Sequence, residues 1–154
     1  MVRISKAVEY ALVAVRHMND HPESLVSARD LSEHYDLPSG LLAKIMQRLA
    51  AAGVVESEQG VRGGYRLARD PGELSFLELS EAVEGPIRTA ACDTNGDGSC
   101  ERTDTCTVAG SVHELSARIV DLLAATSVGE LLEHSAPAPV DSGRGRLTFE
   151  GARL

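Results

Sequence analysis

The chain has 154 residues, 43% of them hydrophobic, so it can bury one core, yet no apolar run approaches the roughly 18 residues that cross a bilayer. The amino terminus lacks the basic and apolar pattern of a secretory signal, so we expect a cytoplasmic protein whose three cysteines serve metal or redox chemistry. The formal net charge of −8 argues weakly against nucleic acid, but residues 1–70 carry nine basic and nine acidic side chains, so we expect any such contact there.

The first predicted element is a helix over residues 3–18. Apolar side chains recur there at helical spacing and should form one buried stripe: Ile4, Ala7, Val8, Ala11, Leu12, Val15 and Met18. Glu9 lies off this stripe, and composition alone predicts that its side chain faces solvent.

Two further helices are predicted to form a helix-turn-helix. Ser27 begins a helix over 27–35 with a capping box, and Pro38 is suited to the first position of a third helix, which ends at Gly53. The third helix should bury Leu41, Leu42, Ile45, Met46 and Leu49, and its polar side carries Ser39, Lys44, Gln47 and Arg48. Two helices joined by a short turn, the second with a basic face, are typical of DNA binding.

The next segment is predicted to be a β-hairpin that forms the wing of a winged helix. Strands are expected at 54–57 and 65–68, around a glycine-rich, basic tip. Glycines let the backbone approach a phosphate or the minor groove, and Arg62 would reach into the groove. An ordinary hairpin with a mobile tip is the alternative. The predicted DNA-binding residues are Ser39, Lys44, Gln47, Arg48, Arg62, Gly63, Gly64 and Tyr65.

The carboxyl-terminal half is predicted to hold three more helices. Ser75 begins one with a second capping box, and Gly85 ends it. A long helix is expected at 108–125, and a short one ends at His134. The apolar side of the long helix is typical of a dimer seam, with covering of its own domain as the alternative: Val112, Leu115, Ile119, Leu122 and Leu123. Residues 135–154 are expected to form a disordered tail.

All three cysteines lie close together in sequence, at the spacing C-x7-C-x5-C: Cys92, Cys100 and Cys106. The residues between them are polar, small and turn-forming, so this loop cannot build a hydrophobic core of its own. Soft thiolates suit an iron–sulfur cluster, zinc or copper(I) better than a hard cation. The loop is therefore predicted to bind a metal or a cluster.

Other uses of the loop remain open from these residues. The segment from Asp93 to Asp104 is similar to a calcium-binding EF-hand loop, but it ends in Asp instead of Glu and no clear helix enters it. Zinc would need His113 beside the three thiolates, at spacings longer than structural zinc sites use. Two cysteines could instead form a reversible disulfide. A second alternative is a module that binds no DNA and acts through a protein partner, and the scattered histidines predict no enzyme.

The order of these parts resembles the Rrf-type family of iron–sulfur winged-helix transcriptional regulators, which includes IscR, NsrR and RirA. The matching pieces are the opening I-S-K-A-V-E-Y-A-L, the wing V-R-G-G-Y-R-L-A, the E-G-P ahead of the loop, and three cysteines before a long helix. The match covers about residues 1–133. The cysteine spacing is closest to the RirA-like members.

The resemblance implies a homodimeric regulator, expected to be a repressor, whose cluster controls its affinity for promoter DNA. Cys92, Cys100 and Cys106 match the cluster thiolates of the family. Glu9 matches the place where NsrR-like members supply a carboxylate from the other subunit. Ala109 stands where IscR-like members have a ligand histidine, so that ligand is absent. The family includes both 2Fe–2S and 4Fe–4S members, and three thiolates with one oxygen favour 4Fe–4S.

The expected fold is mainly α. A winged helix-turn-helix DNA-binding domain should occupy residues 1–85, and the cluster-binding cysteine loop residues 86–107. A dimerisation helix and a short carboxyl-terminal helix should occupy 108–134, and the tail 135–154.

Overall fold

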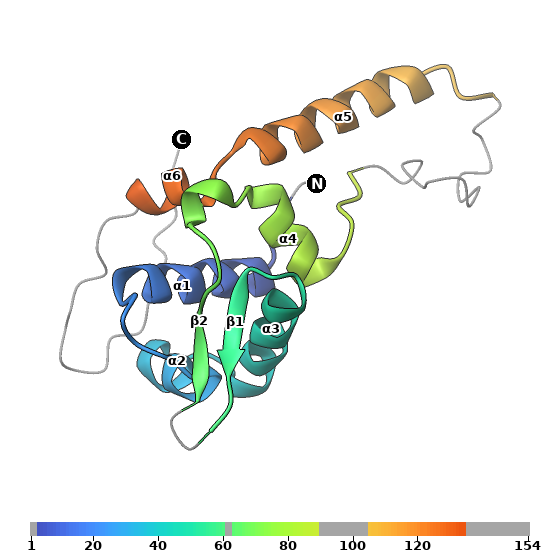
Figure 1. The fold of residues 1–154 in the computed structure, drawn as a ribbon. Coiled ribbons are helices and arrows are strands. Elements are labelled where there is room, and N and C mark those ends of the chain that lie inside the picture. The colour runs from blue at the N-terminus through green and yellow to red at the C-terminus, as the bar shows by residue number, and fades with distance from the viewer. Residues whose placement is uncertain (1–2, 61–62, 90–104, 135–154) are drawn as a thin grey trace.

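The computed structural model describes residues 3–60, 63–89 and 105–134 (Figure 1). In chain order the elements are α1 (Lys6–Asp20), α2 (Ala28–Tyr35), α3 (Ser39–Ala51), β1 (Val55–Glu58), β2 (Gly64–Leu67), the 3-10 helix η1 (Pro71–Glu73), α4 (Phe76–Glu84), α5 (Ala109–Ala125) and α6 (Val128–Glu133). The fold is mainly helical with a two-stranded antiparallel sheet, as the sequence predicts. Arg62, Cys92, Cys100, the segment similar to an EF-hand and the predicted tail lie outside the described residues.

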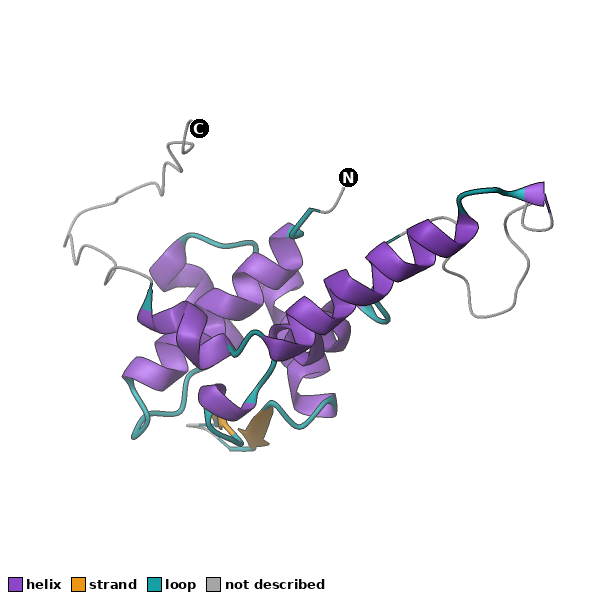
Figure 2. Cartoon of the chain, turned by 90° about the horizontal axis from the view of Figure 1, so that it is seen from above, coloured by secondary structure: helices purple, strands orange, loops and turns teal. Residues whose placement is uncertain are grey.

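The helices form layers around α1 and α4. Figure 1 shows α2, α3 and the hairpin on one side of these two helices, and α5 with α6 on the other. α1 packs against α3 and α4, and α4 also packs against α5. Viewed from above, α5 projects out of this body with its amino-terminal end pointing away (Figure 2). No helix in the described part of the chain has the length and apolar character that a bilayer crossing demands.

The core draws on the apolar faces of α1, α3 and α4. Its fully buried members include Ala11, Val15, Leu42, Ile45, Met46, Leu49, Leu79 and Val83. The predicted α1 stripe was wrong at its first position. Ile4 is 51% exposed, because Ser5 caps the helix by accepting the amide of Val8 and the helix therefore begins only at Lys6.

The helix-turn-helix forms largely as its sequence predicts. Both hydrogen bonds of the Ser27 capping box are present, and Asp36 makes the turn with a left-handed backbone (φ 52°). Pro38 is the residue before α3 and not its first helical residue, so Leu41 falls in the first turn and stays 36% exposed, contrary to the predicted burial. Gly53 (φ 70°) ends α3, and the amide of Val54 donates to the carbonyl of Leu49, as in a Schellman motif.

The hairpin is shifted by one residue from the predicted strands and pairs Val55 with Leu67 and Glu58 with Gly64. A backbone bridge attaches it to the segment before α2, because the amides and carbonyls of Val26 and Tyr65 exchange hydrogen bonds of 3.0 and 2.8 Å. A Cβ on Gly64 would lie 3.0 Å from backbone atoms of Val26. Glycine at this position therefore favours the close approach of the wing to the helix-turn-helix, because a side chain would push the backbone of Val26 away.

The connection between α5 and α6 is fastened to the segment that leads into α4. The amide of Phe76 donates to the carbonyl of Thr126, and the amide of Val128 donates to that of Leu74, both at 2.8 Å. Gly129 lies against the backbone of Gly72, where a Cβ would come within 2.9 Å. We call this contact the α5–α6 joint. It connects the projecting helix to the element that directly follows the wing.

Candidate nucleic-acid interface and cysteine loop

The recognition helix α3 presents all four of its predicted DNA-binding side chains to solvent: Ser39, Lys44, Gln47 and Arg48. Most cationic side chains of the described residues are paired with a carboxylate, as in Lys6–Glu9, Arg16–Asp20, Arg29–Glu33 and Arg69–Glu78. Lys44 forms no ion pair with any described residue. Its ammonium group is available for a phosphate or a base edge.

Arg48 has a second task that the sequence did not indicate. Its Nη1 donates a short hydrogen bond to the carbonyl of Val83, near the end of α4. This carbonyl belongs to the last turn of α4, where the backbone has no helical partner and attracts a cation. Part of the guanidinium group therefore holds α3 against α4, and the predicted DNA contact would have to use its remaining donors.

The base of the wing carries a closed charge network. Arg66 of β2 reaches Glu56 at 2.6 Å and Glu58 at 3.0 Å, both on β1. The two carboxylates would repel phosphates, so any contact of the wing with DNA should come from its tip, beyond this network. Tyr65 is half-buried, and a Cβ on Gly63 would lie 2.4 Å from the carbonyl oxygen of Glu58. The close backbone contacts of the hairpin thus account for glycine at positions 63 and 64 without any contact to DNA.

Glu9 and Cys106 are the two predicted cluster ligands within the described residues. Glu9 lies in the first turn of α1, where Lys6 Nζ contacts its carboxylate at 2.5 Å and its side chain is 35% exposed. Cys106 is half-buried and precedes α5 by a few residues. Figure 1 shows the amino-terminal end of α5 well away from the start of α1. Within one subunit, therefore, these two groups are not brought together.

The solvent-facing side of α5 is apolar at intervals of seven residues. Val108, Leu115 and Leu122 are 57%, 59% and 65% exposed. Between them, Val112 and Ile119 are half-buried, and Ser116 is buried on the side that packs against α4. The predicted seam residues therefore split into two groups, because α5 uses one flank for its own domain and leaves the other uncovered. We call the uncovered residues Leu115 and Leu122, together with Val108 just before the helix, the α5 seam.

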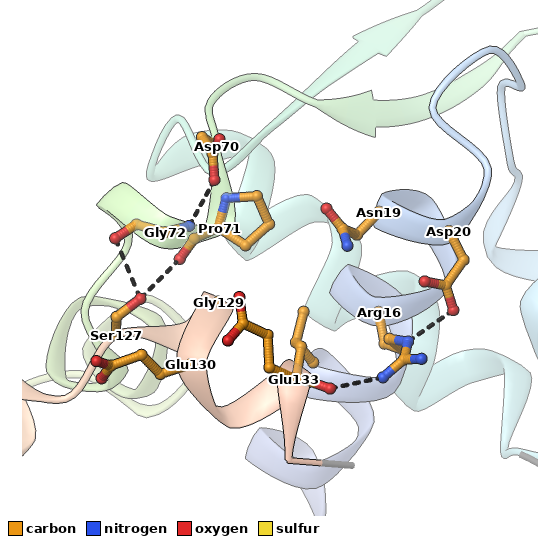
Figure 3. Close-up of a pocket in the computed structure, with 11 residues that line it drawn as sticks. Arg16, Asn19, Asp20, Asp70, Pro71, Gly72, Ser127, Gly129, Glu130 and Glu133 are labelled. Carbon is orange, nitrogen blue, oxygen red and sulfur yellow. Dashed lines mark hydrogen bonds and ion pairs between the residues drawn. The ribbon is translucent and has the colours of Figure 1, made fainter. Parts of the chain in front are cut away.

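A cleft of about 670 Å³ lies between the end of α1, η1 and the start of α6 (Figure 3). Arg16 closes one side of it, with Nε 2.6 Å from Asp20 and Nη1 donating to the carbonyl of Leu132 at 2.8 Å. Asp70, Glu130 and Glu133 also line the cleft. The excess of carboxylates makes this surface unsuited to a phosphate backbone, and it was not among the predicted sites.

The imidazole of His17 on α1 should make the stability of the domain depend on pH. Burial, together with the neighbouring imidazoles of His21 and His34, lowers the pKa of His17 below its ordinary value of 6.5, while Asp20 opposes this shift. The unfolded chain therefore binds more protons than the folded chain as the pH falls through 6.5, and the folded state loses stability in that direction.

The expected result is that the urea midpoint stays constant above neutral pH and falls as the solution is acidified from about pH 7.5 to 5.5. His17→Gln should reduce this fall, because the variant cannot titrate at that position, and His134→Gln on α6 serves as the matched control. Equal pH slopes for the parent and His17→Gln would contradict the assignment.

A protein-family model, Rrf2, whose description reads "Iron-dependent Transcriptional regulator", matches residues 4–134 of the chain. The "HTH-type transcriptional regulator IscR" of Xenorhabdus nematophila is 30% identical over 134 residues, which cover 86% of this chain and 80% of that protein. The protein of the same name from Vibrio cholerae is 30% identical over 132 residues, covering 85% and 75%.

Solved structures share the fold. CymR, the global cysteine regulator of B. subtilis, aligns with a TM-score of 0.65 at 23% identity, covering 88% of this chain and all of that one. IscR of T. potens aligns with a TM-score of 0.64 at 23% identity, covering 92% and 94%. The predicted resemblance is confirmed by the family match.

Proposed function

Because this chain belongs to the Rrf2 family of transcriptional regulators, and is therefore a regulator and not an enzyme, we propose that it binds promoter DNA as a homodimer under the control of an iron–sulfur cluster. The observation that carries the proposal is the position of the three-cysteine loop. It connects α4 of the winged helix to the projecting helix α5. A change at the loop can therefore act on the geometry of the whole dimer.

DNA is bound by the side of the molecule formed by α2, α3 and the hairpin. Lys44 and Gln47 on α3 face the major groove, while the wing tip with Arg62 approaches the minor groove. The exposure of Lys44 and the absence of an ion pair between it and any described residue support this assignment. The carboxylates of the α1–α6 cleft lie on another part of the surface, which keeps them away from the phosphates.

The dimer is formed through the α5 seam. Leu115 and Leu122 on the projecting helix, with Val108 at its N-cap, are three apolar side chains at seven-residue spacing, which is the spacing of positions that a pair of helices buries between them. A second copy of the chain is the occupant that this repeat favours, because an isologous contact places the same seam on both subunits.

The donor set of the loop fits an iron–sulfur cluster. Cys92, Cys100 and Cys106 would hold it as thiolates, and Glu9 of the partner subunit would supply the fourth ligand. Glu9 belongs to the first turn of α1, and the separation of that end of α1 from the start of α5 within one subunit (Figure 1) supports a ligand from the partner. Three thiolates and a carboxylate favour 4Fe–4S. Such a group, when bound, supplies one-electron redox chemistry and sensitivity to oxidants and to iron supply.

Helix α5 and the α5–α6 joint transmit a change in the cysteine loop to the DNA-binding helices. Cys106 lies close to the start of α5, and the α5–α6 joint links the other end of that helix to the segment that follows β2. A tilt of α5 therefore changes the separation of the two recognition helices in the dimer. A ligand that favours one separation shifts the population by its differential affinity. We infer that the cluster-loaded form represses.

The test is an anaerobic gel-shift experiment on fragments of the genomic DNA that surrounds the coding region, with cluster-loaded and chelator-stripped protein. The proposal expects a shifted fragment whose apparent Kd differs between the two forms. Equal affinity of both forms would overturn control by the cluster. A colourless protein with stoichiometric zinc would favour a zinc-dependent regulator, and affinity that follows only thiol oxidation would favour a disulfide switch.

In the same experiment, Lys44→Ala should weaken binding by about 5- to 30-fold, because one lost phosphate or base contact is worth about 1–2 kcal/mol. Arg118→Ala is the matched control, since Arg118 lies on α5, outside the α2, α3 and hairpin side, and is already paired with Glu114 at 2.5 Å. Helical content should be unchanged in both variants by far-UV circular dichroism. Equal DNA affinity of Lys44→Ala and the parent would show that the docking face lies elsewhere.

A further inference from the structure

Three of the five histidines gather where the carboxyl-terminal ends of α1 and α2 meet. His17 and His21 are stacked, with ring centroids 4.5 Å apart and planes at 26°. His34, in the last turn of α2, makes an edge contact with His17 at 5.4 Å. Their scattered positions in the sequence conceal this cluster, although His17 and His21 have the i, i+4 spacing that places two imidazoles on one face of a helix.

The protein fixes one nitrogen of each stacked ring. His21 Nδ1 donates to the carbonyl of His17 at 2.9 Å, so the Nε2 of the neutral ring carries a free lone pair. His17 Nδ1 lies 3.0 Å from the hydroxyl of Tyr35. Among the described residues no hydrogen bond occupies the Nε2 atom of either ring. An imidazole whose Nδ1 donates to a carbonyl, as in His21, is typical of metal ligands, because the bond fixes the tautomer and the ring orientation. The Tyr35 hydroxyl holds the ring orientation of His17 and can accept from its Nδ1 when Nε2 binds an ion.

The surroundings favour a cation. The rings lie at the ends of two helices where backbone carbonyls leave partial negative charge, which attracts positive charge. A hollow of about 320 Å³ opens beside His17 and His21, with room for the water ligands of an ion.

We propose that His17 and His21 bind a divalent late first-row transition-metal ion such as Zn²⁺, with His34 as the third ligand. Neutral imidazole is the preferred nitrogen ligand of these ions. In the described residues no three metal-ligating side chains already surround one point. The i, i+4 spacing places His17 and His21 on one face of α1, and the exposed imidazole of His34 rotates to complete the set. The bound ion ties α1 to α2, the first helix of the helix-turn-helix.

The test uses the full chain with all three cysteines replaced by serine, so that the loop cannot bind the probe. Zn²⁺ is titrated at pH 7.5 in competition with a chromophoric chelator. One ion per chain is expected, and His21→Gln should weaken its binding by about 10- to 100-fold, as the loss of a ligand-shell group does. His34→Gln should weaken binding less, and acidification to about pH 5.5 should release the ion from the parent.

His134→Gln is the matched control, because His134 Nδ1 also contacts the carbonyl four residues before it, Glu130, at 2.7 Å but has no imidazole beside it in the described structure. Zn²⁺ should raise the thermal midpoint of the parent and of this control, and should raise that of His21→Gln by less at the same Zn²⁺ concentration. Parental affinity in His21→Gln, or an equal loss in His134→Gln, would overturn the proposal. His21 is exposed, so its replacement leaves the fold intact and the result does not depend on the cysteine loop.

Discussion

Leu115→Glu is expected to convert the proposed dimer into a monomer. Burying one leucine side chain is worth about 1.5–3 kcal/mol, and a twofold seam contains two copies, so about 3–6 kcal/mol of association free energy is lost before the unpaired carboxylates are counted. The dimer dissociation constant should therefore rise by at least about 100- to 10,000-fold. Affinity for a two-half-site operator should fall with it, because a monomer reads only one half-site.

The measurement is sedimentation equilibrium or light scattering across a concentration series, followed by a gel shift at the same concentrations. Ala117→Glu is the matched control, since Ala117 is exposed on the same helix, outside the α5 seam, and receives the same charge. The folded core should be unaffected in both variants, because Leu115 is 59% exposed in one subunit. A Leu115→Glu protein that remains dimeric would show that the subunits associate through another surface.

Cys106→Ala is expected to abolish the visible absorbance of the anaerobically purified protein. One of three thiolates is lost, and no other cysteine of the chain can replace it. Iron content should fall to near background, while the helical far-UV signal survives, because Cys106 lies outside the buried core. The DNA affinity of the variant should equal that of the stripped parent and should no longer respond to iron.

Thr107→Ala is the matched control for this change, since the neighbouring side chain is exposed and carries no ligand atom preferred by iron. It should keep the parental spectrum and iron content. Glu9→Gln tests the fourth ligand separately, and should weaken the cluster without removing it. Full absorbance in Cys106→Ala would eliminate Cys106 as a ligand and, with it, the proposed donor set.

The helix boundaries could be predicted because the signals for them are local. Capping boxes at Ser27 and Ser75 and the left-handed Gly53 lie within a few residues of the ends that they define, and each was confirmed. Ile4 and Leu41 were placed in the core wrongly for a related reason. In the sequence, apolar residues can keep the helical spacing beyond the residue that caps the helix. Whether such a side chain is buried depends on which element lies opposite, and the local sequence does not determine that.

The site could be predicted only where residue type alone decides the chemistry. Three neighbouring cysteines and an exposed Lys44 can be recognised without a fold. The tie from Arg48 to the carbonyl of Val83 could not, because it joins residues 35 positions apart. The cluster of His17 and His34 was missed for the same reason, since its members come from two helices. The spacing of His17 and His21 was a usable signal that the prediction did not weigh.

The length of α5 determines how large a rotation at the α5–α6 joint results from a given displacement at the cysteine end of the helix. Its 17 residues give an arm of about 25 Å from the α5–α6 joint to the tip beside Cys106. A displacement of about 4 Å at the tip corresponds to a rotation of only about 10° at the pivot, over an arm of that length. The pivot has little freedom to yield, because Gly129 and Gly72 touch backbone to backbone. Ligand rearrangements of a few ångströms at the cysteine loop would thus produce small, well-defined rotations of the winged helix-turn-helix relative to α5.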